Sequence, residues 1–335
     1  MKKLLSGNEA VARGFYEYGG RVAVAYPGTP STEILENMVQ YKDDVNSQWS
    51  PNEKVALEVG IGSSFGGGRT LVAMKHVGVN VAADPLLTVT YSGIKGGFVL
   101  VSADDPGMHS SQNEQDNRYY AKFAKMPLLE PSDSQEAKDF VGLALDISEK
   151  FDTPVLLRTT TRISHTKTVV ELKERKENDS LLGFEKNPSK YVMVPANAKK
   201  RHPVVEERTM KLTAFSESSD INRVEMKSKE MGIITSGIAY QYVKEAFPDA
   251  SVLKLGMSFP LPMDKITSFA QAVDTLYVVE ELEPFIEEMI KARGISVIGK
   301  DVVPRCGELN VEIVRQSLSG RSDGPRSAEK VDEKA

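Results

Sequence analysis

The chain has 335 residues, 40% of them apolar, and a net charge of −5, which is typical of a soluble protein with about two domains of roughly 150 residues. Its scattered Lys and Arg residues do not predict nucleic-acid binding. No apolar stretch approaches the roughly 18 residues that span a membrane, and we find no signal-like segment, so we expect a cytoplasmic protein. The single cysteine, Cys306, excludes a disulfide framework or a cysteine-ligated cluster within these residues.

The first half of the chain alternates predicted strands and helices. Ser6 and Glu9 have the spacing of a capping box that opens the first helix, which Gly19-Gly20 would end. Strands are predicted at 21–26, 45–49, 68–75, 97–103, 128–130 and 154–160. Helices are predicted at 30–41, 52–65, 79–91 (bent or broken by Pro85), 118–124 and 134–150. This alternation predicts an α/β fold with a doubly wound, mostly parallel sheet.

The second half predicts another, smaller α/β domain. Residues 173–203 are charged and weakly periodic, and we expect them to connect a first unit, 1–172, to a second, 204–318. The second unit has predicted strands at 231–235, 251–255, 275–279 and 295–298, and helices at 239–246, 262–270 and 284–293. Residues 319–335 lack apolar side chains that could bury surface, so we expect a disordered tail.

The segment Tyr26-Pro-Gly-Thr-Pro-Ser-Thr-Glu33 closes a predicted strand and opens a helix that Ser31 or Thr32 would cap. Open α/β sheets bind ligands where strands end in tight turns before helices. Thr29, in this turn, either makes a local backbone bond or presents its hydroxyl to a substrate carboxylate. Glu53, in the first turn of the next helix, either gains up to about 1 kcal/mol from the helix dipole or exchanges a proton with a cofactor.

A long polar loop, Asp104–Asn117, follows the most apolar predicted strand. Such a loop at the end of a parallel strand is either a solvated excursion or a binding segment. His109 is its candidate acid, base or substrate contact, and Arg118 is a candidate anion or subunit contact. His76 follows another strand end at the same edge, but two histidines without a third ligand do not predict a metal site.

The run Gly60-Ile-Gly-Ser-Ser-Phe-Gly66 lacks the spacing and the preceding strand of a dinucleotide-binding fingerprint. We therefore expect its small residues to allow close packing, either of a helix on the sheet or of subunit on subunit.

Several segments together resemble the family of indolepyruvate ferredoxin oxidoreductase alpha subunits, which are thiamine-diphosphate enzymes of the 2-oxoacid:acceptor oxidoreductase superfamily. These segments are Gly7-Asn-Glu-Ala10, Tyr26–Glu33, Asn52-Glu-Lys54, Met74-Lys-His-Val-Gly78, Asp104–Arg118 and Pro304-Arg-Cys-Gly-Glu-Leu-Asn310. The resemblance covers about residues 4–318. It implies a thiamine-diphosphate pyrimidine-binding domain at 1–172 and a transketolase C-terminal-like domain at 204–318.

The resemblance also suggests roles for the candidate residues at the cofactor. We predict that Glu53 and His109 are catalytic, and that Glu53, Pro27, Thr29 and His76 contact thiamine diphosphate. Glu53 would hydrogen-bond a ring nitrogen of the aminopyrimidine and share its proton, which helps to form the reactive carbanion.

The predicted substrate-binding residues are Thr29, Lys75, His76 and Gln112. Relatives that act on pyruvate place an arginine after the strand at 97–103, where this chain has Asp104-Asp105. Recognition of the substrate carboxylate must therefore differ here, and Lys75, His76 and His109 are the candidates.

The family's alpha subunit continues into a diphosphate-binding domain with a magnesium motif and into a ferredoxin-like domain with cysteine clusters, and these 335 residues contain neither motif. The resemblance thus implies that Mg²⁺ and 4Fe-4S clusters lie on a partner domain or chain. We expect a hetero-oligomer with a diphosphate-binding/ferredoxin-domain chain and a gamma-type subunit, and no activity from the isolated chain.

The expected reaction is the oxidative decarboxylation of an indolepyruvate or aryl pyruvate-type 2-oxoacid to an acyl-CoA, with coenzyme A as acceptor of the acyl group and ferredoxin of the electrons. Two alternatives remain open. One is a subunit of a non-oxidative thiamine-dependent 2-oxoacid decarboxylase, and the other is a non-catalytic module that binds a partner.

Overall fold

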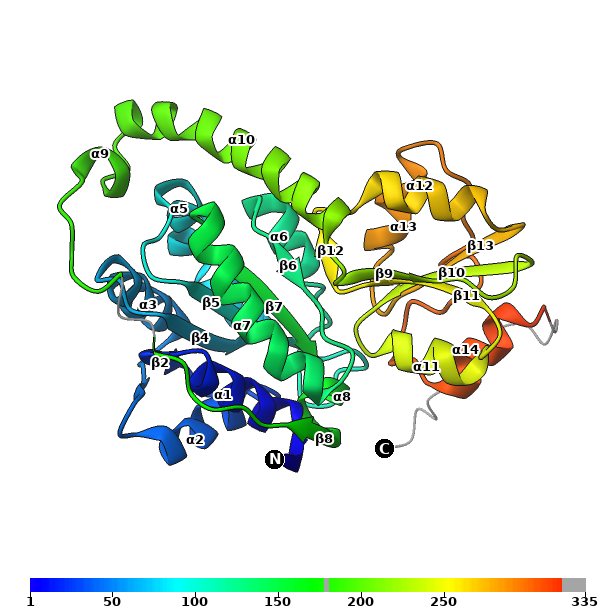
Figure 1. Ribbon diagram of the computed structural model, residues 1–335, viewed down its shortest axis with the longest axis horizontal. Helices are drawn as coiled ribbons and strands as arrows, with labels where there is room; N and C mark the ends of the chain where they lie inside the picture. The colour runs from blue at the N-terminus through cyan, green and yellow to red at the C-terminus, as the bar shows by residue number, and fades with distance from the viewer. Residues whose placement is uncertain (178–180, 321–335) are drawn as a thin grey trace, which may run out of the picture.

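The computed structural model describes residues 1–177 and 181–320, which form two α/β lobes (Figure 1). The first lobe holds a seven-stranded sheet in the order β12-β6-β7-β5-β4-β2-β3. Its strands are β2 (Val22–Ala25), β3 (Asn46–Trp49), β4 (Thr70–Lys75), β5 (Phe98–Asp104), β6 (Leu128–Leu129), β7 (Val155–Thr160) and β12 (Met257–Phe259). All neighbours pair in parallel except β12, which is antiparallel to β6. The predicted mostly parallel sheet is confirmed.

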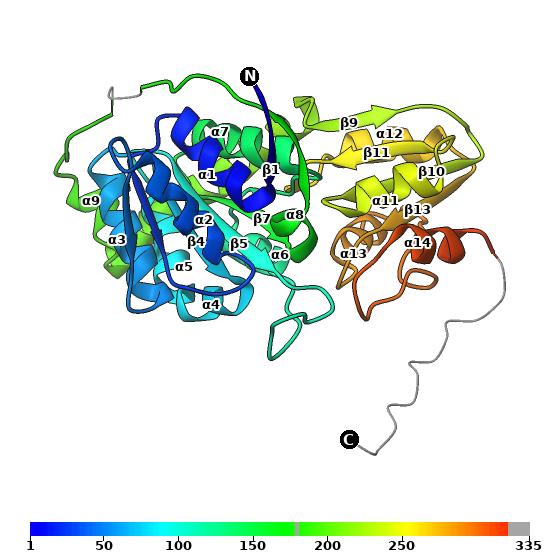
Figure 2. The same ribbon diagram turned by 90° about the horizontal axis from the view of Figure 1, so that it is seen from below.

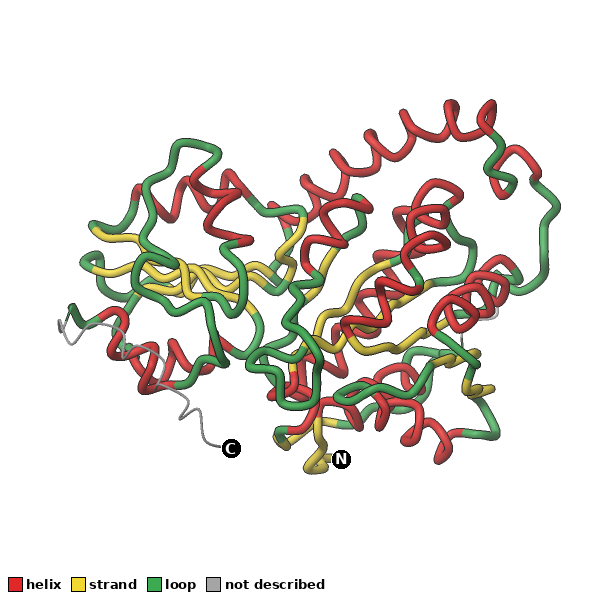
Figure 3. Tube along the Cα trace, turned by 180° about the vertical axis from the view of Figure 1, so that it is seen from behind, coloured by secondary structure: helices red, strands yellow, loops and turns green. Residues whose placement is uncertain are grey.

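Helices cover both faces of this sheet, as the tube view in Figure 3 also shows. Along β4, Leu71 and Ala73 belong to one buried cluster, whereas Val72 and Met74 belong to the other. The first cluster includes residues of α1 (Gly7–Glu17), α2 (Thr32–Met38), α7 (Ser134–Phe151) and α8 (Thr161–His165). The second includes residues of α3 (Glu53–Phe65), α4 (His76–Val81), α5 (Ala83–Ser92) and α6 (Arg118–Ala124). Because both faces are buried, the central strands β4, β5 and β7 contain runs of apolar residues.

The first helix begins as predicted. The Ser6 hydroxyl accepts a hydrogen bond from the Glu9 backbone N–H at 3.2 Å, and the Glu9 carboxylate accepts one from the Ser6 N–H at 2.7 Å. The predicted cap of α2 is wrong, because neither candidate hydroxyl caps the helix. Ser31 Oγ donates to the Gly28 carbonyl and Thr32 Oγ1 accepts from the Gly28 N–H, both at 2.8 Å. The two hydroxyls stabilise the turn instead.

The predicted helix at 79–91 begins earlier in the structure, at His76, and it divides at Ala82 into α4 and α5. The division agrees with the predicted break at Pro85, which has no N–H to donate to the carbonyl of Val81, the last residue of α4. Pro85 then lies in the first turn of α5, where a residue without an N–H costs no further intrahelical hydrogen bond.

The second lobe contains a four-stranded sheet in the order β13-β10-β11-β9. Its strands are β9 (Asn222–Glu225), β10 (Met231–Ser236), β11 (Ser251–Leu255) and β13 (Thr275–Val279). Its helices are α11 (Ala239–Ala246), α12 (Met263–Gln271), α13 (Phe285–Lys291) and α14 (Val311–Leu318). The predicted strand at 295–298 is wrong, because this segment makes only an isolated bridge between Ile298 and Tyr277.

Segments that join the lobes were not evident from the sequence. After α9 (Pro188–Tyr191), the 24-residue helix α10 (Pro195–Ser218) passes through Pro203, the predicted end of the connection (Figure 1). Strand β12 comes from the second half of the chain but extends the first sheet. The domain boundaries therefore remain proposals, and residues 321–335 of the predicted tail lie outside the described part of the chain.

A small antiparallel pair, β1 (Lys2–Ser6) with β8 (Lys167–Glu171), also lay outside the prediction. Among the helices that the structure describes, none is both long enough and apolar enough to cross a membrane.

Candidate functional site

The candidate residues gather at one edge of the first sheet. Strands β2, β4, β5 and β7 run in parallel, so the segments that follow them leave the sheet on the same side. These segments carry Thr29, Lys75 and His76, the loop of residues 105–117, and Thr161. In Figure 2 the loop projects at the boundary between the two lobes. The strand ends predicted to form a site therefore do lie side by side.

Glu53 is half-buried in the first turn of α3, behind the N-cap residue Asn52, whose side chain accepts a hydrogen bond from the Val55 N–H at 3.0 Å. Its carboxylate lies against Gly78 of α4, since a Cβ added to Gly78 would be 2.6 Å from Glu53 Oε1. Among the residues that the structure describes, none makes a hydrogen bond or an ion pair with this carboxylate. It is therefore free to bind a ligand.

His76 is fully buried at the start of α4. Its Nε2 lies 3.3 Å from the backbone oxygen of Asn113 in the loop. Because a carbonyl oxygen can only accept, we assign the proton of the neutral imidazole to Nε2. Nδ1 is then an acceptor, and it is buried without a hydrogen-bond partner. A buried acceptor of this kind is suited to an N–H or O–H group of a ligand.

Lys75 ends β4 and lies next to the turn after β2. Its ammonium donates a hydrogen bond to the Ser110 backbone oxygen at 2.6 Å. A Cβ added to Gly28 would be 3.0 Å from Lys75 Cβ, so the turn packs directly on this side chain. Pro27 and Thr29 in the turn are exposed. The predicted cofactor and substrate contacts thus occupy neighbouring segments at the sheet edge.

The loop 105–117 is anchored at its first residue. The Asp105 carboxylate accepts hydrogen bonds from the Ser110 N–H at 2.9 Å, from Ser111 Oγ at 2.5 Å and from Thr161 Oγ1 at 2.6 Å. Burial raises the pKa of Asp105, but these hydrogen bonds outweigh it and hold the pKa below its ordinary value. Gln112 lies exposed on the loop. An ionised Asp105 therefore keeps the loop folded back on the sheet edge.

His109 is directed at the second lobe. Its Nε2 lies 3.1 Å from Glu308 Oε2. His109 belongs to the loop and His76 contacts it at Asn113. The two histidines do not hydrogen-bond to each other in the described part of the chain. Within the described residues, no group of three or more His, Cys, Asp or Glu could hold a metal ion.

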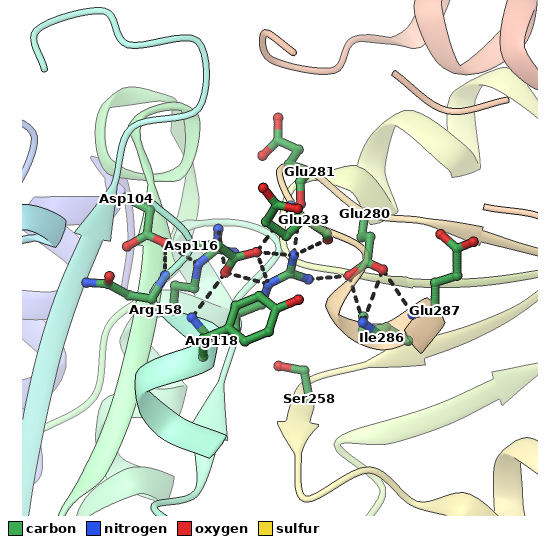
Figure 4. A network of polar contacts seen from close by, with 12 residues as sticks. Asp104, Asp116, Arg118, Arg158, Ser258, Glu280, Glu281, Glu283, Ile286 and Glu287 are labelled. Atoms are coloured by element: carbon green, nitrogen blue, oxygen red, sulfur yellow. Dashed lines mark hydrogen bonds and ion pairs between the residues drawn. The ribbon is translucent and has the colours of Figure 1, made fainter. Parts of the chain in front are cut away.

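Arg118, the candidate anion or subunit contact, does contact anions, but these are carboxylates of its own chain. Its side chain is 1% exposed and donates to Asp116 and Glu280, both at 2.5 Å (Figure 4). Burial lowers the pKa of Arg118, but Asp116 and Glu280 raise it well above its ordinary value. The guanidinium is thus a permanent charge that ties the end of the loop to the second lobe.

Arg158, which lies on the buried strand β7, was not among the residues predicted from the sequence. It donates to Asp104 at 2.7 Å and to Glu130 at 2.5 Å, and Ser258 of the second half donates to Glu130 at 2.5 Å. A charged residue inside an apolar strand was the available signal, because such a charge needs buried partners.

A hollow of about 500 Å³ lies elsewhere, between α12, β13 and residues 295–298. Asp274 is the only charged residue among those that line it. Although large pockets are the default choice for a site, this one lacks converging chemical groups. We therefore place the candidate site at the sheet edge with Glu53.

A family model described as pyruvate flavodoxin/ferredoxin oxidoreductase, thiamine diphosphate-binding, matches residues 13–233. The chain belongs to this family. It is 46% identical over 332 residues to the indolepyruvate oxidoreductase subunit IorA of Archaeoglobus fulgidus, covering 95% of this chain and 53% of the relative. It is 44% identical to IorA of Pyrococcus horikoshii, covering 99% and 55%. The chain thus spans about half the length of these curated relatives, and the resemblance found in its motifs is confirmed.

Two solved structures share the fold of this member of the oxidoreductase family. The 2-oxoglutarate:ferredoxin oxidoreductase of Magnetococcus marinus matches with a TM-score of 0.78 and 17% identity, over 95% of this chain and 65% of that chain. A split-gene transketolase matches with a TM-score of 0.61 and 13% identity, over 94% and 97%. At these identities the likeness shows the fold alone, and it confirms the predicted thiamine-diphosphate type of fold.

Proposed function

We propose that this chain is part of a thiamine-diphosphate-dependent 2-oxoacid oxidoreductase of the indolepyruvate type, and that it binds the aminopyrimidine ring of the cofactor. One observation carries the proposal: the half-buried carboxylate of Glu53 has no partner among the described residues and is held against Gly78 at the sheet edge. Family membership and relatives named indolepyruvate oxidoreductase subunits support the same assignment.

The groups at this edge fit such a ring. Glu53 would hold or release the proton of a ring nitrogen, and the unpartnered Nδ1 of His76 would accept an N–H. When bound, thiamine diphosphate supplies an electron sink for the carbanion left by loss of carbon dioxide. Gly78 leaves the space that the Glu53 carboxylate occupies. Pro27 and Thr29 would border the same ligand from the turn after β2.

Lys75 is the best candidate for the substrate carboxylate. An ammonium has three donors, and one of them is used on the Ser110 carbonyl. Thr29 and Gln112, both exposed, would complete the polar surroundings of the substrate. Asp104 takes no part, because its fully buried carboxylate accepts hydrogen bonds from Arg158 and from the Asn117 N–H.

We further propose that the rest of the enzyme supplies what these residues do not. The IorA relatives are almost twice as long, so the diphosphate-binding half with Mg²⁺ and the 4Fe-4S clusters would lie on a partner domain or chain, with a gamma-type subunit beside it. Coenzyme A would take the acyl group and ferredoxin the electrons. A cytoplasmic hetero-oligomer belongs to this proposal.

The test is Glu53→Gln in the complex purified with its native partners. We expect kcat to fall by about 100-fold or more, because the amide cannot exchange a proton, while the melting temperature stays the same. Glu58→Gln is the matched control, since Glu58 lies on the same helix, is exposed and pairs only weakly with Lys54 at 3.9 Å. Acyl-CoA and reduced viologen are the products to measure.

Full activity of the Glu53→Gln complex would contradict the assignment of the cofactor site. Free aldehyde in place of acyl-CoA would instead identify a non-oxidative decarboxylase.

A further inference from the structure

The polar loop is held from both lobes of the molecule. On the first lobe, Lys75 Nζ donates to the Ser110 oxygen at 2.6 Å and His76 Nε2 lies 3.3 Å from the Asn113 oxygen. On the second lobe, Glu308 contacts His109, the residue directly before Ser110. The backbone that faces the candidate site is therefore positioned partly by a residue almost 200 positions away in the sequence.

Glu308 lies between the loop and helix α8. Its Oε2 accepts from His109 Nε2 at 3.1 Å and from Arg162 Nε at 2.6 Å, and its Oε1 pairs with Arg162 Nη2. The loop also approaches the Glu308 backbone, since a Cβ added to Gly107 would be 3.3 Å from Glu308 N. The loop thus contacts the second lobe through backbone packing at Glu308 and through the Glu308 carboxylate, which accepts hydrogen bonds from both His109 and Arg162.

The charge of this carboxylate is secured by its neighbours. The hydrogen bond from Arg162 lowers the pKa of Glu308 below its ordinary value, against burial, and His109 lowers it further. An ionised acceptor forms stronger hydrogen bonds than a neutral one. Glu308 therefore binds His109 firmly although its side chain is 24% exposed.

The segment that presents Glu308 is rigid for independent reasons. The next residue, Leu309, is buried, and its N–H donates to Glu281 Oε1 at 3.1 Å. Asn310 then caps α14 by accepting from the Ile313 N–H at 2.9 Å. Side chains on a fixed segment can hold a mobile loop in one conformation, whereas side chains on a mobile segment cannot.

We propose that Glu308 is a positioning residue: through His109 it holds residues 107–113 of the loop against Lys75 and His76, so that the second lobe sets the shape of the candidate site. This gives the motif Pro304–Asn310 a role in positioning the loop, whereas the proposed function assigns it no role. The consequence for the loop is independent of the proposed function, while any consequence for turnover rests on it.

Amide hydrogen exchange of the full chain, followed by mass spectrometry, tests the proposal. In Glu308→Ala we expect exchange in residues 107–113 to rise about 10-fold, with strand β5 unchanged. Glu308→Gln keeps an acceptor but loses the charge, so its increase should be smaller. Glu312→Ala is the control, because Glu312 is exposed and its partners among the described residues, Arg315 and Gln316, lie on its own helix.

His109→Ala removes the same contact from the side of the loop and must give the same pattern. The double variant should exchange no faster than either single variant, because both remove one interaction. Wild-type exchange of residues 107–113 in both single variants would overturn the proposal, and His109→Ala decides alone if Glu308→Ala fails to fold.

In the complex with its partners, Glu308→Ala should raise KM for the 2-oxoacid about 10-fold with a smaller change in kcat, the opposite of Glu53→Gln. Faster loop exchange together with wild-type activity of Glu53→Gln would contradict the proposed function and leave the role of Glu308 intact.

Discussion

At the candidate site, the direction of each hydrogen bond determines what a side chain can still bind. The Nε2–H of neutral His76 donates to the Asn113 carbonyl, and Nδ1 remains as an acceptor. His76 can therefore bind an N–H or O–H group of a ligand but not a carboxylate. Lys75 keeps two donors after binding Ser110. His109 is engaged by Glu308. Of the three candidates for the substrate carboxylate, the structure therefore favours Lys75.

We predict that Lys75→Met raises KM for the 2-oxoacid by about 10-fold or more, because a hydrogen bond to a charged group contributes roughly 1.5–3 kcal/mol. Lys54→Met is the matched control, since Lys54 makes long ion pairs with Glu58 at 3.9 Å and Asp84 at 3.7 Å. Steady-state kinetics of the complex would show the difference, and equal KM values in the two variants would exclude Lys75 as the ligand.

The glycines of helices α3 and α4 have different structural roles, which depend on what lies next to each of them. A Cβ on Gly60 would be 2.5 Å from Val72 Cγ2, so this glycine allows the helix to pack on the sheet, one of the two possibilities left by the sequence. Gly62, half a turn further, has nothing within 4 Å. Gly78 instead makes room for the carboxylate of Glu53.

We predict opposite results for two substitutions of the same kind. Gly62→Ala should stabilise the isolated chain by up to about 1 kcal/mol, because alanine favours an exposed helix. Gly78→Ala should displace the Glu53 carboxylate and lower the activity of the complex by about 10-fold or more. Thermal melts and kinetics of both variants would test this, and wild-type activity in Gly78→Ala would show that the position of Glu53 is unimportant.

At the scale of the whole molecule, the two lobes are joined by a buried polar network. Arg118 reaches Glu280 of the second lobe and the backbone oxygens of Glu281 and Glu283 at 2.9 and 3.0 Å (Figure 4). Burial raises the pKa of Glu281, because only the Leu309 N–H and more distant cations oppose it. A network of this kind gives little net stability but makes any single loss costly.

We predict that Arg118→Met lowers the free energy of unfolding by about 3–5 kcal/mol, because it leaves the carboxylates of Asp116 and Glu280 buried without their cation. Arg315→Met, which removes a half-exposed i,i+3 pair with Glu312, should change it by less than about 0.5 kcal/mol. Urea unfolding compares the two. A similar small effect in both variants would mean that Arg118 contributes little to holding the two lobes together.

Much of the site could be predicted from the sequence because parallel strands bring their ends to one edge. Thr29, Lys75 and His76 were assigned to that edge from strand ends and tight turns, which are local signals. The roles of Arg118 and Glu308 could not be predicted in this way. Their partners lie 162 and 199 positions away, and local patterns carry no record of such pairs.

The sequence by itself determined the alternation of strands and helices, the capping box at Ser6, and the apolar strands of a sheet covered on both faces, because periodicity and capping act over a few residues. Only the tertiary structure decided that β12 extends the first sheet, that α10 continues through Pro203, and that residues 295–298 form a single bridge. These outcomes depend on which distant surfaces pack together, and packing between lobes outweighs local propensity.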